Sequence, residues 1–137
     1  MLISEVLSAM RTKIAKGWTQ KASARDVDGN ICDPSSDKAA TWCVLGSYAA
    51  VAPRDQFRTW FKVADRLHKH TGPGWTDGWN DTEGRTQEEV LIALDKAIAD
   101  TVKDEASGAQ DDMSTESKPT EILKEIEPLE EKPNEDK

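Results

Sequence analysis

Residues 86–102 read TQEEVLIALDKAIADTV and carry the strongest helix signal in the chain of 137 residues. Thr86 is followed three residues later by Glu89, the spacing of a capping box, in which the two side chains satisfy free backbone donors at a helix start. Apolar residues then recur at intervals of three and four. This pattern predicts an amphipathic helix that begins after Thr86, with an apolar face of Val90, Leu91, Leu94, Ala97, Ile98 and Val102.

Upstream of this helix, three further segments have the periodicity or composition of helices. Residues 2–16 place apolar side chains on one face and are followed by Gly17, a common helix stop. Residues 39–53 contain no charged side chain, and we expect a central helix there that Pro53 ends. Pro53 also suits the first position of a third helix, whose apolar stripe would comprise Phe57, Trp60, Phe61, Ala64 and Leu67.

Two glycine-containing segments interrupt these helices. Asp28-Gly29, a pair that favours tight turns, lies within residues 18–31, where the helical period disappears, and it predicts a short two-stranded ribbon. Residues 72–84 hold half of the eight glycines in the chain and are typical of a loop. We therefore expect a mainly α fold, a compact four-helix domain with a short β-hairpin after the first helix.

The charges divide the chain into two parts. Of the 18 basic and 26 acidic residues, residues 103–137 hold five basic and twelve acidic ones, so this stretch carries −7 of the formal net charge of −8. All five tryptophans lie before it. We expect a globular domain over residues 1–102 and a disordered acidic tail over residues 103–137, because the tail has too few apolar residues to offset its ordering entropy.

The tail contains one short apolar cluster, residues 122–129. Ile122, Leu123, Ile126 and Leu129 lie at helical offsets among Glu and Lys, although Pro128 would truncate a helix. Two interpretations stay open. The cluster is either residual hydrophobicity in a disordered tail or a segment that folds when it docks on a partner.

The location and the classes of partner follow from charge and leader sequence. The chain has no basic leader before an apolar stretch, and its longest uncharged run is shorter than the roughly 18 apolar residues of a membrane span. Two cysteines are too few for a disulfide framework. These features predict a cytoplasmic protein with reduced thiols and no membrane contact. The acidic balance argues against nucleic acid as a partner, because binders of the phosphate backbone concentrate Lys and Arg.

Four residues are candidate metal ligands, namely Cys32, Cys43, His68 and His70, but their spacing lacks the close ligand pairs of a structural zinc site. Cys43 and His68 also form a conceivable nucleophile and base. Cys43 lies in the uncharged run, where a buried structural thiol is expected. The chain has no nucleophile elbow, phosphate loop or His-Glu-x-x-His motif. We therefore expect no catalytic residue, no metal and no cofactor.

The loop after the third predicted helix is unusual in composition because it holds two tryptophans and several acids. Arg85 is expected to pair with Asp77 or Asp81. The tryptophans either cover the core or form an exposed anchor for a partner. A similar Trp-bearing turn follows the first helix, and we expect the two turns to meet. The candidate partner-binding residues are therefore Trp18, Gln20, Trp75, Asp77, Trp79 and Arg85, with Ile122, Leu123 and Ile126 in the tail.

Three stretches of the sequence are distinctive in combination. They are Gly17-Trp18-Thr19-Gln20 followed by Ala24-Arg25-Asp26 and Gly29; Trp42-Cys43-Val44-Leu45-Gly46; and Trp79-Asn80-Asp81 with Arg85-Thr86 and Glu89-Val90-Leu91. Together they resemble a family of small uncharacterised helical domains found in bacteria and some of their phages. The resemblance covers residues 2–100 and leaves the tail outside. It implies a shared fold and assigns no activity or catalytic residue.

These features favour a non-enzymatic protein, bacterial or phage-encoded, that works by binding another protein, with a phage-encoded version modulating a host factor. The alternative is a small enzyme or ligand-binding domain that uses a cleft near the Trp75–Trp79 loop, with Asp77, Asp81 and Arg85 and with Cys43 or His68. Direct nucleic-acid binding ranks third, since residues 1–102 carry a net charge of only −1. The identity of the partner and the oligomeric state stay open.

Overall fold

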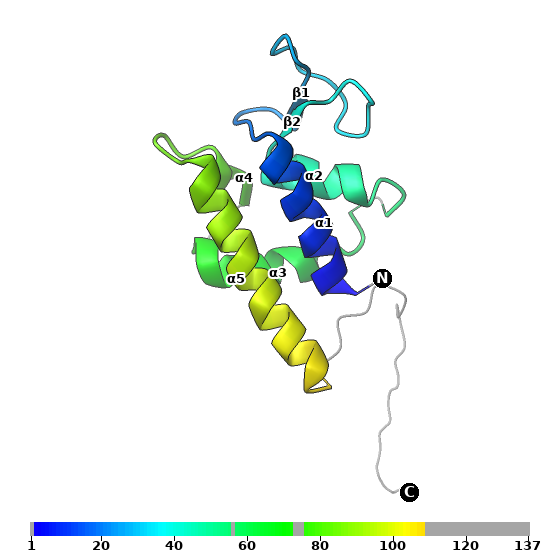
Figure 1. The fold of residues 1–137 in the computed structure, drawn as a ribbon, viewed down its shortest axis with the longest axis vertical. Helices are drawn as coiled ribbons and strands as arrows, with labels where there is room; N and C mark the ends of the chain where they lie inside the picture. The colour runs from blue at the N-terminus through cyan, green and yellow to red at the C-terminus, as the bar shows by residue number, and fades with distance from the viewer. Residues whose placement is uncertain (1, 56, 73–75, 109–137) are drawn as a thin grey trace, which may run out of the picture.

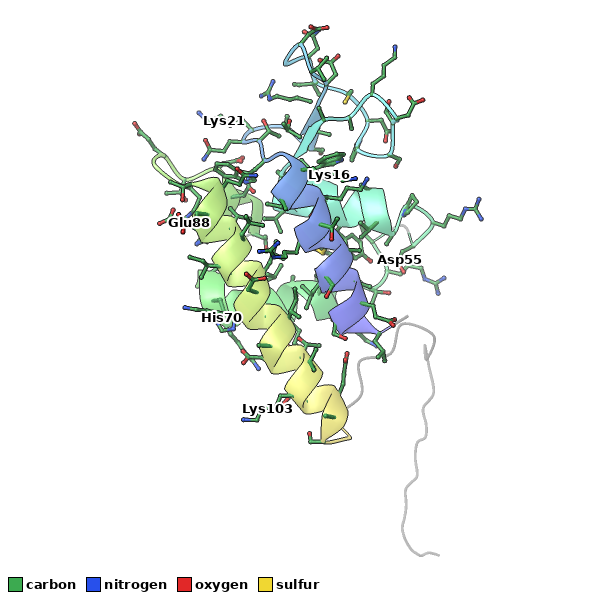
Figure 2. The ribbon with its side chains drawn as sticks, in the orientation of Figure 1. Lys16, Lys21, Asp55, His70, Glu88 and Lys103 are labelled. Atoms are coloured by element: carbon green, nitrogen blue, oxygen red, sulfur yellow. The ribbon has the colours of Figure 1, made fainter. Side chains whose placement is uncertain are left out.

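The computed structural model describes residues 2–55, 57–72 and 76–108, and these form five helices and one small antiparallel sheet. The mainly helical fold with a short β-ribbon is confirmed (Figure 1). Charged side chains project from the outer faces of the helices (Figure 2). Among the described residues, no helix is long and apolar enough to cross a membrane. In chain order the elements are α1 (Ile3–Lys16), β1 (Ala24–Arg25), β2 (Thr41–Trp42), α2 (Val44–Val51), α3 (Trp60–Thr71), α4 (Thr76–Asn80) and α5 (Gln87–Ala106).

Helices α1 and α5 lie side by side and run antiparallel (Figure 1). Ser4, near the start of α1, donates to Glu105 at the end of α5, and Arg11 forms an ion pair with Asp95 at 2.7 Å. The apolar face predicted for α1 is buried, which confirms the periodicity argument there. The face predicted for α5 is confirmed in part, because Leu91 and Ile98 are partly buried and Val102 is 49% exposed. The apolar residues without exposed surface are Ile3, Val6, Leu7, Met10 and Ile14 of α1 and Val90, Leu94 and Ala97 of α5.

The start of α5 has the predicted capping box. The Thr86 hydroxyl accepts from the Glu89 amide at 3.2 Å, and the Glu89 carboxylate accepts from the Thr86 amide at 3.0 Å. The helix ends at Ala106, four residues beyond the boundary expected at residue 102. The last turn of α5 therefore belongs to the helical part of the chain.

The single helix expected across residues 39–52 is wrong in its first part. Thr41 and Trp42 form β2 and pair with Arg25 and Ala24, and only Val44–Val51 is helical. Cys43 is the N-cap of α2, and its Sγ accepts from the Gly46 amide at 3.2 Å. Tertiary strand pairing thus overrides the helical composition of this stretch.

The expected ribbon after the first helix is present, but its second strand comes from a more distant segment. The turn at Asp28-Gly29 forms, with Gly29 at a φ of +84°, and brings Arg25 opposite Ile31 in a single bridge. The ladder itself joins Ala24–Arg25 to Thr41–Trp42. The residues between the turn and β2 therefore form a loop inside the hairpin.

Two further boundaries differ from the prediction. Pro53 follows the end of α2 as expected, but α3 begins only at Trp60, after a turn in which Phe57 adopts a φ of +62°. Residues 72–84 were expected to be a loop and contain the short helix α4. Phe57 therefore lies in a turn before α3, and Trp79 lies in α4 instead of a loop.

Candidate functional site

The fully buried side chain of Asn80 joins three segments that are distant in sequence. Its Oδ1 accepts from Trp18 Nε1 at 2.8 Å and from the Val44 amide at 3.1 Å. Its Nδ2 donates to the Thr19 carbonyl at 3.2 Å and to Asp81 Oδ1 at 2.9 Å. All four hydrogen-bonding positions of the amide are therefore used, as a buried polar group requires.

The two Trp-bearing turns meet, as the sequence predicts. Gln20 donates its side-chain amide to the carbonyls of Asn80 and Thr82, both at 3.0 Å, and the Lys21 amide donates to Asp81 at 2.8 Å. The polar atoms of Trp18 and Gln20 are thus directed at the neighbouring turn. This arrangement favours a structural role for both residues.

Arg85 packs against Trp79. Its guanidinium lies 4.1 Å from the centroid of the Trp79 ring, and its Nε donates to the Trp79 carbonyl at 3.0 Å. Its ion-pair partner is Glu89, at 3.6 Å, whereas Asp81 bonds with Lys21 and Asn80. Arg85 therefore pairs with Glu89 in the first turn of α5 instead of with Asp81.

Several predicted partner-binding residues lie outside the described part of the chain. Trp75 and the tail residues Ile122, Leu123 and Ile126 are among them. Asp77 belongs to α4 by its backbone.

The candidate metal ligands are not gathered into one group. His70 Nε2 lies 2.7 Å from Asp100 on α5, and His68 Nε2 lies 3.5 Å from the Thr76 hydroxyl. Cys43 is buried at the start of α2, while Cys32 is only partly buried. Within residues 2–55, 57–72 and 76–108, no three His, Cys, Asp or Glu side chains are placed to share a metal ion.

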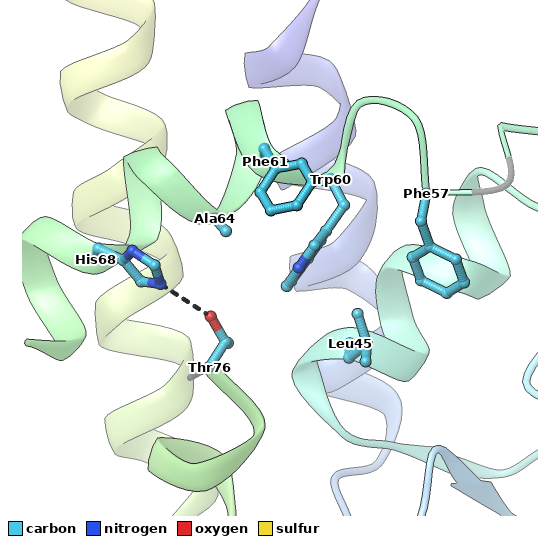
Figure 3. Close-up of a pocket in the computed structure, with 7 residues that line it drawn as sticks. All are labelled: Leu45, Phe57, Trp60, Phe61, Ala64, His68 and Thr76. Carbon is cyan, nitrogen blue, oxygen red and sulfur yellow. Dashed lines mark hydrogen bonds between the residues drawn. The ribbon is translucent and has the colours of Figure 1, made fainter. Parts of the chain in front are cut away.

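One feature that the sequence analysis missed is an apolar hollow beside α3, which we call the α3 groove. It has a volume of about 420 Å³. Figure 3 shows aromatic rings along one side and the His68–Thr76 hydrogen bond at the other end. The groove is lined by Leu45, Phe57, Trp60, Phe61, Ala64, His68 and Thr76.

The aromatic residues at the groove are unusually exposed for their size. Phe61 is 77% exposed and Phe57 is 45% exposed, although both were predicted to belong to a buried stripe. The buried face of α3 is instead formed by Val63, Ala64 and Leu67, together with the aliphatic part of Arg66. The prediction is therefore confirmed for Ala64 and Leu67 and wrong for Phe57 and Phe61.

The sequence segment that contains α3 has a net charge opposite to that of the whole chain. Residues 52–72 carry five basic and two acidic side chains, a net charge of +3 in a chain of −8. Arg66 pairs with Asp104, and this ion pair lowers the pKa of the Asp104 carboxyl. Lys62 and Lys69 are exposed on α3. The groove thus has apolar walls, and its helix α3 belongs to a segment of net positive charge in which Arg66 is paired with α5.

Tyr48, Asp55 and Thr59 form a hydrogen-bonded cluster next to the aromatic residues of the groove. The Tyr48 hydroxyl donates to Asp55, which also accepts from the Thr59 amide at 2.8 Å and the Thr59 hydroxyl at 2.9 Å. The Tyr48 ring contacts Phe57 and Trp60, with centroids 5.7 and 5.1 Å apart. Tyr48 therefore links the turn before α3 to the aromatic wall of the groove.

The same contacts shift two pKa values in opposite directions. Burial and the hydrogen bond to Asp55 raise the pKa of Tyr48. Burial alone would raise the pKa of Asp55, but the hydrogen bonds from Tyr48 and Thr59 outweigh it and lower that pKa. Because the folded-state pKa of Asp55 is depressed, its contribution to stability is present above its unfolded value of 3.8 and is lost as the pH falls through the folded value.

Replacing Tyr48→Phe is expected to raise the pKa of Asp55, because the strongest donor to the carboxylate is removed while the ring contacts remain. Carboxyl NMR titration of both chains measures the change. The Asp104 carboxyl is an internal control, since Arg66 lowers its pKa independently of Tyr48. An unchanged Asp55 titration in the variant would show that the Tyr48 hydroxyl does not stabilise the ionised carboxylate.

Fold and site together define a small helical domain with an apolar groove beside α3. A family described as a family of unknown function (DUF6197) matches residues 1–100, and the chain belongs to this family. This confirms the expected membership of an uncharacterised family. No curated protein and no solved structure matches the chain. The matched region contains the Asn80 contacts and the whole α3 groove.

Proposed function

We propose that this chain is a cytoplasmic, bacterial or phage-encoded protein that works by binding another protein, and that the α3 groove is its binding surface. The observation that carries the proposal is the exposure of Phe61 and Phe57 beside a hollow of about 420 Å³. Aromatic side chains next to a pocket are typical anchors of protein interfaces. A partner that fills the groove would remove their apolar surface from water.

The charge around the groove indicates the chemistry of the partner. Apolar walls suit one or two aliphatic or aromatic side chains, and the net charge of +3 over residues 52–72 suits acidic neighbours. The best fit is therefore a short segment in which apolar residues are flanked by Asp or Glu. Segments of this kind commonly order only when they bind.

The contacts of the Trp-bearing turns support placing the partner on α3. Trp18 and Gln20 bond with Asn80, and Arg85 covers Trp79. Groups already engaged within the chain have less to offer a partner than the exposed ring of Phe61.

A second candidate function, ligand binding, is favoured by the polar end of the groove. Thr76 lies in the Trp75–Trp79 loop region where a cleft was expected, and its hydroxyl is 3.5 Å from His68 Nε2. The groove volume lies within the range of roughly 300–1,000 Å³ for small-molecule sites. His68→Ala would weaken a polar small molecule at this end but leave the binding of a protein segment at Phe61 nearly unchanged.

We expect Phe61→Asp to abolish partner binding, because it places a negative charge where an acidic segment docks and removes an apolar anchor. Tagged full-length chain is incubated with lysate of the organism that encodes it, and bound proteins are quantified by mass spectrometry. At least one protein retained by the wild type should fall by about tenfold or more with the variant. Retention of that protein should also decrease with increasing salt, since Lys62 and Lys69 of α3 are exposed.

Val27→Asp is the matched control, because Val27 is 86% exposed and belongs to the turn that follows β1. The β1–β2 ribbon lies away from α3 (Figure 1). It introduces the same charge at an equally exposed apolar site. A set of bound proteins that is the same for the wild type and both variants would overturn the proposal.

A further inference from the structure

The chain itself contains a segment with the chemistry that the α3 groove favours. Residues 121–130 read EILKEIEPLE, with four acidic residues, one basic residue and a net charge of −3. Residues 52–72 carry +3. The apolar residues of the segment are Ile122, Leu123, Ile126 and Leu129.

The described chain ends close to α3. Helices α3 and α5 are in contact and antiparallel, since Arg66 pairs with Asp104 and His70 pairs with Asp100. Gly108, the last described residue, is one helical turn beyond Asp104 in sequence. The described chain therefore ends four residues after the contact of α5 with Arg66 of α3.

The linker is long enough to reach the groove. Ile122 lies fourteen positions after Gly108, and at about 3.3 Å per residue an extended linker of this length spans about 45 Å. Helix α3 has 12 residues, which corresponds to a length of about 18 Å. A tether of this length gives an effective concentration on the order of 1 mM. Even a weakly binding segment would therefore occupy the groove for much of the time.

We propose that residues 121–130 dock into the α3 groove of the same chain and compete there with the partner. This inference rests on the proposed function, because it assigns an occupant to the same groove. The Ile122 and Ile126 side chains fill the apolar hollow, and the flanking glutamates are attracted by the net positive charge of residues 52–72. The tail then acts as an internal competitor that an external segment must displace.

Photo-crosslinking of the purified full-length chain tests this docking. Phe61→p-benzoylphenylalanine places the reactive group at the rim of the groove, and mass spectrometry locates the adduct. We expect an intramolecular adduct to residues 121–130 whose yield does not depend on protein concentration. Ile122→Ser combined with Ile126→Ser should lower that yield by about tenfold. Met113→Ser, which changes an apolar tail residue outside the segment, should leave it unchanged.

Three results would overturn the inference: no adduct to residues 121–130, adducts spread evenly along the tail, or an adduct that joins two chains. The last result would identify a second copy as the occupant. Failure of this test is separable from failure of the proposed function, because it uses the purified chain alone. Position 61 could give no adduct to the tail in the purified chain while retention of a lysate protein still depends on Phe61. That pair of results would reject only the tail as the occupant of the groove.

Discussion

Replacing Asn80→Ala is expected to lower the free energy of unfolding by about 4 kcal/mol, a large part of the stability of a domain of this size. The substitution leaves the Trp18 Nε1–H and the Val44 amide without their acceptor in a fully buried position. Each buried donor left unpaired costs about 1–3 kcal/mol. The Thr19 carbonyl loses its donor as well. Urea unfolding followed by tryptophan fluorescence measures the change.

Asn30→Ala is the matched control for Asn80, because Asn30 is exposed in the hairpin turn. It should change stability by no more than about 0.5 kcal/mol. If the two asparagine variants unfolded at similar urea concentrations, the Asn80 side chain would not hold its own segment to the segments at Trp18 and Val44.

Gly46→Ala is expected to destabilise the fold by about 3 kcal/mol or to prevent folding. A Cβ at this position would lie 1.9 Å from the Ser23 carbonyl oxygen and 2.7 Å from the Ser23 carbonyl carbon. These are backbone atoms, and the same oxygen accepts from the Cys43 amide at 3.1 Å. Relief of the clash would therefore separate α2 from the segment that leads into β1.

Gly78→Ala provides the control within another helix. A Cβ added at Gly78 meets no atom within 4 Å, so alanine is expected to leave stability unchanged or to raise it by up to about 1 kcal/mol. Thermal unfolding of both variants gives the comparison. Equal melting temperatures for the two would contradict a close approach of α2 to Ser23.

Local signals in the sequence are sufficient for the helices that pack along one continuous apolar face. The periodicity of residues 2–16 and the capping box at Thr86 predicted α1 and the start of α5, since helix ends and amphipathic faces depend on neighbouring residues. The β2 strand was missed because its pairing with Ala24–Arg25 is a tertiary interaction. Composition alone made Thr41 and Trp42 indistinguishable from the helix that follows them.

The meeting of the two Trp-bearing turns was predictable, but its centre was not. Trp18 and Trp79 are conspicuous in sequence, whereas Asn80 resembles any polar loop residue until three backbone segments converge on it. The close approach at Gly46 likewise depends on Ser23, a residue more than 20 positions away. Both features arise from packing between distant segments.

The α3 groove could not be found from the sequence because two apolar faces overlap on that helix. One face with helical spacing comprises Phe57, Trp60, Phe61, Ala64 and Leu67. A second face contains Val63 and Leu67, which are four residues apart. Phe61 and Val63 lie two positions apart and so point about 200° away from each other. The structure buries Val63 and exposes Phe61, which turns a predicted core residue into a surface anchor.

In-cell photo-crosslinking at Phe61 tests most directly whether the α3 groove binds a partner protein. Chains carrying p-benzoylphenylalanine at position 61, or at the exposed control position Val27, are irradiated in the organism that encodes them, and the crosslinked peptides are sequenced. Our account predicts adducts to another protein from position 61 only, within a segment of apolar residues flanked by Asp or Glu. Equal adducts from both positions, or no adduct to another protein from position 61, would contradict it.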